Sequence, residues 1–77
     1  MRINIKYFGQ IAELTQIEEE YMECSGRLVS DLLETLNSKY DALKTKDFKI
    51  AQNQELVSAE TELTGAEIAL LPPFAGG

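Results

Sequence analysis

Residues 28–40 have the sequence LVSDLLETLNSKY, which carries the strongest periodic pattern in this chain of 77 residues. Apolar side chains recur there three or four positions apart, at Val29, Leu32, Leu33, Leu36 and Tyr40. That spacing puts them on one face of an α-helix and leaves polar side chains on the other. The pattern predicts one amphipathic helix, which needs an apolar surface to cover.

Segments on both sides of this helix have the alternating pattern of β-strands. Ile3, Ile5 and Tyr7 alternate with polar residues over residues 2–8, and residues 17–24 show a weaker alternation. Three further strands are predicted after the helix, at residues 48–52, 56–57 and 67–71. The pattern favours an α+β domain in which the helix packs on one face of a mixed sheet of four or five strands.

The segments between these elements carry turn signals and polar residues. Residues 9–15 are predicted to form a helical turn or short helix, Asn53-Gln54 a hairpin turn, and residues 39–46 a polar connection. The run Glu18–Glu20 is expected on a solvated edge strand, because acids at such an edge discourage pairing with another chain. Leu28 stands where a Ser or Thr would normally cap the helix.

The composition argues against several kinds of function. The chain has no His, no Trp and one Cys, so Ser/His or Cys/His catalysis lacks its base and a Cys/His metal site lacks its ligands. We expect no bound cofactor. The net charge of -6, from 7 basic and 13 acidic residues, argues against a nucleic-acid partner. No apolar run is long enough to span a membrane, so we expect a cytoplasmic protein.

The predicted order is strand, strand, helix, strand, short strand, strand. This order resembles the β-grasp fold of ubiquitin-like proteins, although a fold by itself says little about function. We expect residues 1–72 to form the β-grasp domain and residues 73–77 to form a projecting C-terminal tail.

The tail has a composition suited to threading. Pro72 and Pro73 stiffen the exit from the last strand, and Gly76 and Gly77 have no side chains. Such an end can pass through a narrow tunnel and bring its carboxylate to a catalyst on another protein. The pattern predicts Gly77 as the reactive residue, with Gly76, Ala75, Phe74 and Pro73 as the threading residues. A frayed chain end is the alternative.

Three motifs resemble the small subunit of molybdopterin synthase, a family of ubiquitin-like sulfur carriers. They are YFGQIAEL at residues 7–14, AQNQELV at residues 51–57 and LPPFAGG at residues 71–77. The resemblance covers most of the chain. The family often has Arg where Ala12 stands, so one polar contact to a partner is expected to differ here.

This resemblance implies a mechanism in which partner proteins supply the catalytic groups. An ATP-dependent adenylyltransferase, similar to the ubiquitin-activating enzyme, would adenylate the Gly77 carboxylate, and sulfur would replace AMP to leave a thiocarboxylate. The large subunit of molybdopterin synthase would then receive the tail and transfer the sulfur to a pterin precursor. The resemblance also implies a heterotetramer, in which two carriers flank a dimer of the large subunit. The free chain is expected to be a monomer without active-site side chains of its own.

Apolar residues outside the predicted core suggest where a partner would dock. Alternation places Phe8 and Leu71 on the sheet face opposite the helix, and Leu56 lies in the short strand nearby. We expect these three residues to dock the large subunit, as the matching positions do in the family, with Phe74 as an anchor in a partner groove. Scattered exposed apolar residues are the alternative.

Several other functions fit the same residues. A sulfur carrier for thiamine thiazole synthesis or for tRNA thiolation would share the Gly-Gly end, and the Pro-Pro lead-in favours the pterin pathway among these. A ubiquitin-like modifier could use the same activated carboxylate on lysines. A β-grasp interaction module with an inert tail is the remaining alternative.

Overall fold

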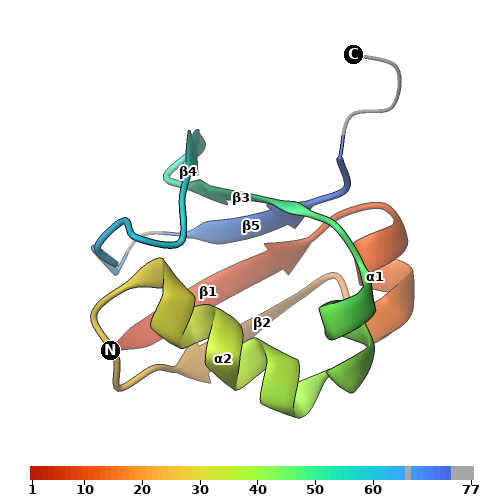
Figure 1. Ribbon diagram of the computed structural model, residues 1–77, viewed down its shortest axis with the longest axis horizontal. Coiled ribbons are helices and arrows are strands. Elements are labelled where there is room, and N and C mark those ends of the chain that lie inside the picture. The colour runs from red at the N-terminus through yellow and green to blue at the C-terminus, as the bar shows by residue number, and fades with distance from the viewer. Residues whose placement is uncertain (66, 74–77) are drawn as a thin grey trace.

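The computed structural model describes residues 1–65 and 67–73. The elements are β1 (Arg2–Tyr7), α1 (Gln10–Thr15), β2 (Glu19–Glu23), α2 (Val29–Lys39), the 3₁₀ helix η1 (Asp41–Thr45), β3 (Lys49–Gln52), β4 (Glu55–Val57) and β5 (Ile68–Leu71). The strands form one five-stranded sheet in the order β2-β1-β5-β3-β4, and α2 lies across it (Figure 1). The predicted α+β architecture is confirmed, with β1, β2, β3 and β5 shorter than predicted.

The first and last strands lie side by side in the middle of the sheet. β1 pairs with β5 in parallel, so that Ile5 is opposite Ile68 and Tyr7 is opposite Leu70. All the other pairings are antiparallel. Because β1 and β5 run in the same direction, their C-terminal ends lie at the same end of the sheet.

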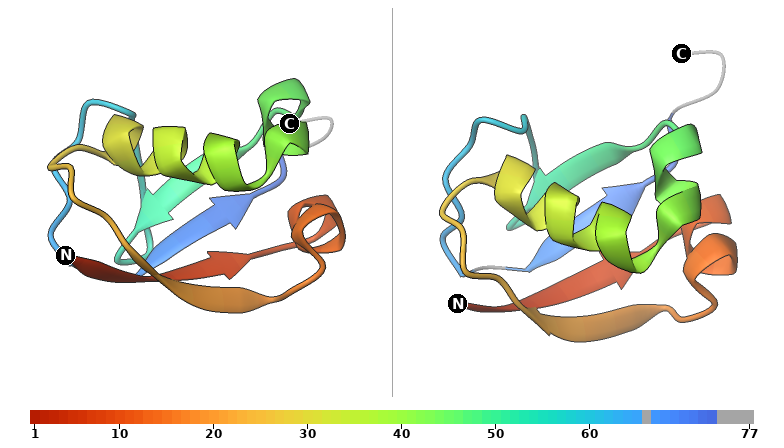
Figure 2. Two further views of the ribbon diagram at one scale, coloured as in Figure 1. Left: turned by 90° about the horizontal axis from the view of Figure 1, so that it is seen from below. Right: turned by 60° about the horizontal axis from the view of Figure 1, so that its bottom comes forward.

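One face of the sheet and the apolar side of α2 form the core. Figure 2 shows α2 packed across this face, as the helical spacing predicts. The side chains from the central strands and the helix are fully or almost fully buried: Ile3, Ile5, Tyr7, Ile68, Leu70, Val29, Leu32 and Leu36. None of the helices among residues 1–65 and 67–73 is long and apolar enough to cross a membrane.

Backbone carbonyls of a distant loop replace the missing side-chain cap of α2. The Val29 N–H donates to the Thr61 carbonyl at 2.8 Å, and the Ser30 N–H donates to the Ala59 carbonyl at 2.8 Å. From inside the helix, Asp31 accepts hydrogen bonds from the Leu28 N–H at 3.0 Å and from the preceding amide at 2.9 Å. The N–H groups at the start of the helix are therefore satisfied although the Leu28 side chain has no acceptor.

The hairpin between β3 and β4 forms where the Asn-Gln pair predicts it. Asn53 and Gln54 both have positive φ, at 54° and 69°. Positive φ at both central residues is typical of a type I′ turn, whose twist matches that of the two strands it joins. Gln52 is buried beside this turn and donates to the Glu62 carbonyl at 3.0 Å. It also accepts from the Thr64 N–H at 3.1 Å, so one amide ties the following loop to β3.

The prediction that residues 39–46 are only a polar connection is wrong. They contain η1, and its Leu43 side chain is 1% exposed within the core. The Tyr40 carbonyl accepts from the Leu43 N–H at 2.9 Å, which turns Leu43 inward directly after α2. A single apolar residue among polar ones has no periodicity, so the pattern did not reveal it.

Leu43→Ala should therefore lower the free energy of unfolding by about 2–5 kcal/mol, because it leaves a cavity in a packed core. Lys46→Ala is the matched control, since Lys46 is exposed directly after η1 and its truncation should change stability by less than about 0.5 kcal/mol. Urea denaturation of both variants measures this difference. Equal stabilities would show that η1 contributes nothing to the core.

Candidate docking face and C-terminal exit

The face of the sheet opposite α2 carries a row of small and apolar residues. Leu56 on β4 pairs with Ala51 on β3, and Ala51 pairs with Ala69 on β5. Ala69 pairs in turn with Lys6 on β1. Residues directly opposite one another share a face, and the neighbours of Ala69 on β5 point into the core. This row therefore lies on the open face, which α2 does not cover.

A second row lies at the edge where the central strands end. Leu71 on β5 is opposite Lys49 on β3, and the Phe8 N–H donates to the Leu70 carbonyl at 3.1 Å. Phe8 and Leu71 are thus brought together, whereas Lys49 and Ala51 on β3 separate them from Leu56. Phe8 is 44% exposed and Leu56 is 60% exposed, while Leu71 is half-buried. Their docking role stays a prediction.

The chain leaves β5 in contact with the end of β1. Pro72 follows Leu71 directly, and its ring packs on Gly9, where a β carbon would lie 3.0 Å from the Pro72 Cγ atom. Pro73 is exposed. The other tail residues, Phe74, Ala75, Gly76 and Gly77, lie outside the described residues, so their roles stay predictions.

Next to Phe8 the surface is hollowed. The hollow has a volume of about 400 Å³ and is lined by Lys6, Tyr7, Phe8, Gly9, Ala12, Glu18 and Glu19. The methyl group of Ala12 leaves this space open. Lys6 forms an ion pair with Glu67 at 3.2 Å. Among the described residues, Glu18, Glu19 and Lys49 form no ion pair.

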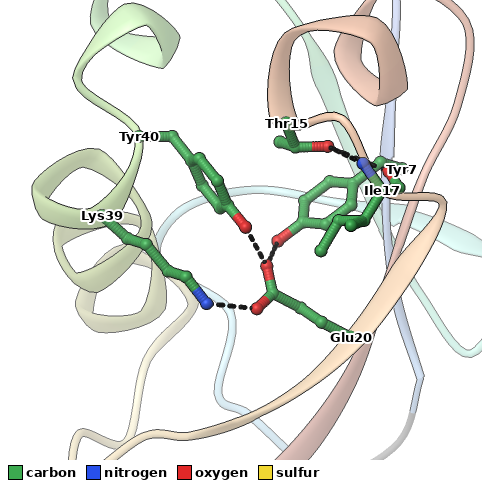
Figure 3. Close-up of polar contacts among 6 residues, drawn as sticks. All are labelled: Tyr7, Thr15, Ile17, Glu20, Lys39 and Tyr40. Atoms are coloured by element: carbon green, nitrogen blue, oxygen red, sulfur yellow. Dashed lines mark hydrogen bonds and ion pairs between the residues drawn. The ribbon is translucent and has the colours of Figure 1, made fainter.

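Glu20 does not belong to a solvated edge, which corrects the expectation for the Glu18–Glu20 run. Its side chain is 12% exposed and points from β2 toward the end of α2 (Figure 3). The Tyr7 and Tyr40 hydroxyls donate to Glu20 Oε2 at 2.5 Å and 2.6 Å, and Lys39 pairs with the other oxygen. The two tyrosine rings meet edge to face, with centroids 6.0 Å apart. The cluster joins the edge strand to the helix.

The surroundings shift the pKa values of this cluster. Burial raises the pKa of Glu20, but hydrogen bonds from Lys39, Tyr40 and Tyr7 outweigh burial and hold the pKa below its ordinary value of 4.5. Burial and the hydrogen bond to Glu20 raise the pKa of Tyr7 far above its usual range, and the same causes raise the pKa of Tyr40. Both phenols therefore remain protonated donors to a charged carboxylate.

No group of three or more Cys, Asp or Glu side chains among residues 1–65 and 67–73 could hold a metal ion. The only thiol, on Cys24, is buried. The described surface features are an open sheet face, a hollow beside Phe8 and a stiff exit from β5.

The fold defines a β-grasp domain, and comparison with known proteins identifies its family. The model of the ThiS family matches residues 5–77, so the chain belongs to the ThiS family. No curated protein matches the chain.

Solved structures with this fold resemble the chain over nearly its whole length. The putative molybdopterin converting factor subunit 1 of Pyrococcus furiosus is 28% identical with a TM-score of 0.88, covering 96% of this chain and 99% of that one. Small archaeal modifier protein 1 of Methanosarcina acetivorans is also 28% identical, with a TM-score of 0.80 and coverages of 99% and 96%. A chain in the complex of subunits 1 and 2 of the Helicobacter pylori molybdopterin-converting factor is 27% identical, with a TM-score of 0.71 and full coverage of both chains. The β-grasp prediction is confirmed.

The Glu20 cluster should make the free energy of unfolding depend on pH in the acid range. Because the folded-state pKa of Glu20 lies below 4.5, its contribution is present above pH 4.5 and is lost as the pH falls through the folded-state pKa. Glu20→Gln should therefore be less stable than the wild type at neutral pH, with a gap that closes in acid. Urea denaturation across this range measures the gap.

Glu19→Gln is the matched control, because Glu19 is exposed on the same strand and its replacement should change stability little. A gap between wild type and Glu20→Gln that stays constant into acid would contradict a role for the Glu20 charge.

Proposed function

We propose that this chain is a sulfur carrier that holds sulfur as a thiocarboxylate on Gly77 and delivers it within molybdopterin synthase. The observation that carries the proposal is the match to the ThiS family, which runs through residue 77 and so includes Gly76 and Gly77. The geometry at the base of the C-terminal tail also supports the proposal. Leu71 and Pro72 leave the sheet beside exposed Phe8, so a partner that receives the tail can also bind the open face.

The proposed chemistry activates a carboxylate, which is otherwise a poor electrophile. In the first step the Gly77 carboxylate attacks the α-phosphorus of ATP, giving an acyl-adenylate and releasing pyrophosphate. A hydrosulfide-equivalent donor then attacks the acyl carbon, so that a C–S bond forms, the C–O bond to AMP breaks, and loss of a proton leaves the thiocarboxylate. An adenylyltransferase similar to the ubiquitin-activating enzyme would supply the catalytic groups for activation, and ATP would bind to it.

Delivery of the sulfur also depends on catalytic groups from a partner protein. The thiocarboxylate sulfur forms a bond to a carbon of the pterin precursor and displaces an oxygen leaving group from it. Water then cleaves the acyl C–S bond, which leaves sulfur on the pterin and restores the Gly77 carboxylate. The large synthase subunit would supply the active site in a heterotetramer, and the reaction would take place in the cytoplasm.

Two of the similar structures favour the pterin pathway. The Pyrococcus furiosus and Helicobacter pylori proteins are both described as molybdopterin converting factor subunits, and the second is a complex with its subunit 2. That complex supports a large-subunit partner for this chain. Thiamine thiazole synthesis and tRNA thiolation use the same carrier chemistry and stay as alternatives.

A ubiquitin-like modifier is a second candidate function. The similarity to the Methanosarcina acetivorans modifier protein, at 28% identity, favours it. The activated Gly77 carboxylate would then form an isopeptide bond with a lysine amine instead of accepting sulfur. Both functions need the same first step, and they differ in the nucleophile that attacks the acyl-adenylate.

Deletion of Gly77, or its extension by one Ala, should abolish ATP-dependent activation without unfolding the domain. The reason is that either change moves the terminal carboxylate away from the position in the activating enzyme from which it attacks ATP. ATP–pyrophosphate exchange measures activation, and circular dichroism checks the fold. Gly65→Ala serves as a control, because Gly65 lies in a loop outside the tail.

Intact-mass measurement then separates the candidate functions. After incubation with the activating enzyme, ATP and a sulfide donor, a carrier gains the mass of one sulfur in place of one oxygen. A modifier appears instead as conjugates on lysines. An extended variant that still gains sulfur at its terminus would rule out the proposed function.

Phe8→Ala should weaken binding of the large subunit at least tenfold while changing stability little. Phe8 is 44% exposed, so its truncation should cost much less than the roughly 3–5 kcal/mol of a buried Phe. Calorimetric titration measures the binding, and thermal unfolding measures the stability. Ser38→Ala is the control, since Ser38 is exposed on α2, which covers the opposite face of the sheet. Equal binding by both variants would exclude Phe8 from the interface.

A further inference from the structure

Gly9 occupies a backbone conformation that side chains rarely adopt. It precedes α1 with φ of 55° and ψ of -131°. The Gly9 carbonyl accepts from the Ala12 N–H at 3.1 Å and from the Glu13 N–H at 3.3 Å. These bonds fix the residue between the end of β1 and the first turn of α1. A non-glycine residue here would be strained.

The same glycine leaves room for the proline ring at the exit from β5. A β carbon on Gly9 would lie 3.0 Å from Pro72 Cγ, 3.6 Å from Cδ and 4.0 Å from Cβ. Carbon atoms in good contact are about 3.5–4.0 Å apart, so only the outer part of the ring would clash. Positive φ alone does not require this contact. Gly65 has φ of 86°, and among the described residues the nearest atom to its β carbon would be the Met1 sulfur at 3.9 Å.

Both sides of the contact are stiff. The ring of Pro72 fixes its own φ, and Pro73 does the same one residue later. Leu71, just before them, is paired with Lys49 in the sheet. On the other side, the Phe8 N–H is bonded to the Leu70 carbonyl at 3.1 Å. A displacement of Pro72 is therefore resisted by the pairing of Leu71 before it and by the fixed φ angles of the two prolines.

We propose that Gly9 is a positioning residue for the proposed sulfur-carrier function. Its missing side chain lets Pro72 rest against the end of β1, and this contact sets the direction in which the C-terminal segment leaves the sheet. The direction decides how the Gly77 carboxylate meets ATP on the activating enzyme. The inference rests on the proposed function, because it assigns to Gly9 the presentation of that same carboxylate.

The test compares two glycines that share a positive φ and differ in what a methyl group would meet. Gly9→Ala and Gly65→Ala should both lose some stability in urea denaturation. ATP–pyrophosphate exchange is then measured with the activating enzyme from the same organism, at a temperature where both variants are folded. Gly9→Ala should lower kcat by about tenfold, because the Pro72 ring must give by a few tenths of an ångström and a misplacement of about 1 Å can cost about 100-fold. Its KM should change little, and Gly65→Ala should retain the wild-type kcat.

A second substitution tests whether the effect passes through the proline ring. Pro72→Ala removes Cγ and Cδ and keeps Cβ, which is at an acceptable 4.0 Å. The double variant Gly9→Ala with Pro72→Ala should therefore recover most of the lost kcat. A merely structural role of Gly9 predicts no such recovery, because the backbone strain at position 9 remains.

The outcomes separate the inference from the function on which it rests. Exchange activity of the wild type that disappears on deletion of Gly77 supports the proposed function. If that activity is present and Gly9→Ala matches Gly65→Ala, or if Pro72→Ala gives no recovery, the positioning role is wrong and the proposed function stands. A wild type that is not activated overturns both.

Discussion

Parallel pairing of β1 with β5 is the constraint on which the rest of the structure depends. It places the first and last strands at the centre of the sheet, where Ile5 and Ile68 are opposite one another beneath α2. The C-terminal ends of two antiparallel strands lie at opposite ends of a sheet, whereas those of β1 and β5 lie at the same end. Phe8 and Gly9 therefore meet Leu71 and Pro72. The pairing that stabilises the core also brings the base of the tail to an exposed aromatic residue.

The two faces of the sheet have separate roles because side chains alternate across each strand. Residues facing α2 are tightly packed, so a change there alters stability. On the open face, the short side chains of Ala51 and Ala69 occupy the centre of the sheet, and the larger side chains of Leu56 and Lys6 lie on either side of them. Substitutions on this face can change a partner contact at little cost to folding. A small domain can in this way keep one core and still adapt its binding surface.

Local patterns predicted the sheet, the main helix and the open face, since each depends on the spacing of neighbouring residues. They missed Leu43, Glu20 and the capping of α2, which depend on residues far apart in the sequence. Glu20 looked like one of three equivalent acids until Tyr7 and Tyr40 were placed around it. The sequence placed Gly9 in a turn after the first strand, but its contact with Pro72 depends on the β1–β5 pairing. Long-range contacts of this kind leave no period in a single sequence.

In the proposed mechanism, the reactive carboxylate has the same chemistry whichever acceptor receives the sulfur. Selectivity must then come from the protein that binds the carrier, and that protein can recognise only what the domain displays around the tail. Near the exit these features are Phe8, Leu71, Lys49 and the hollow that Ala12 leaves open. An Arg at position 12 would add a positive charge close to Glu18 and Glu19 and fill part of this space. The hollow is therefore a place where this chain would differ in shape and charge from a carrier with Arg at position 12, and partner choice would act through it.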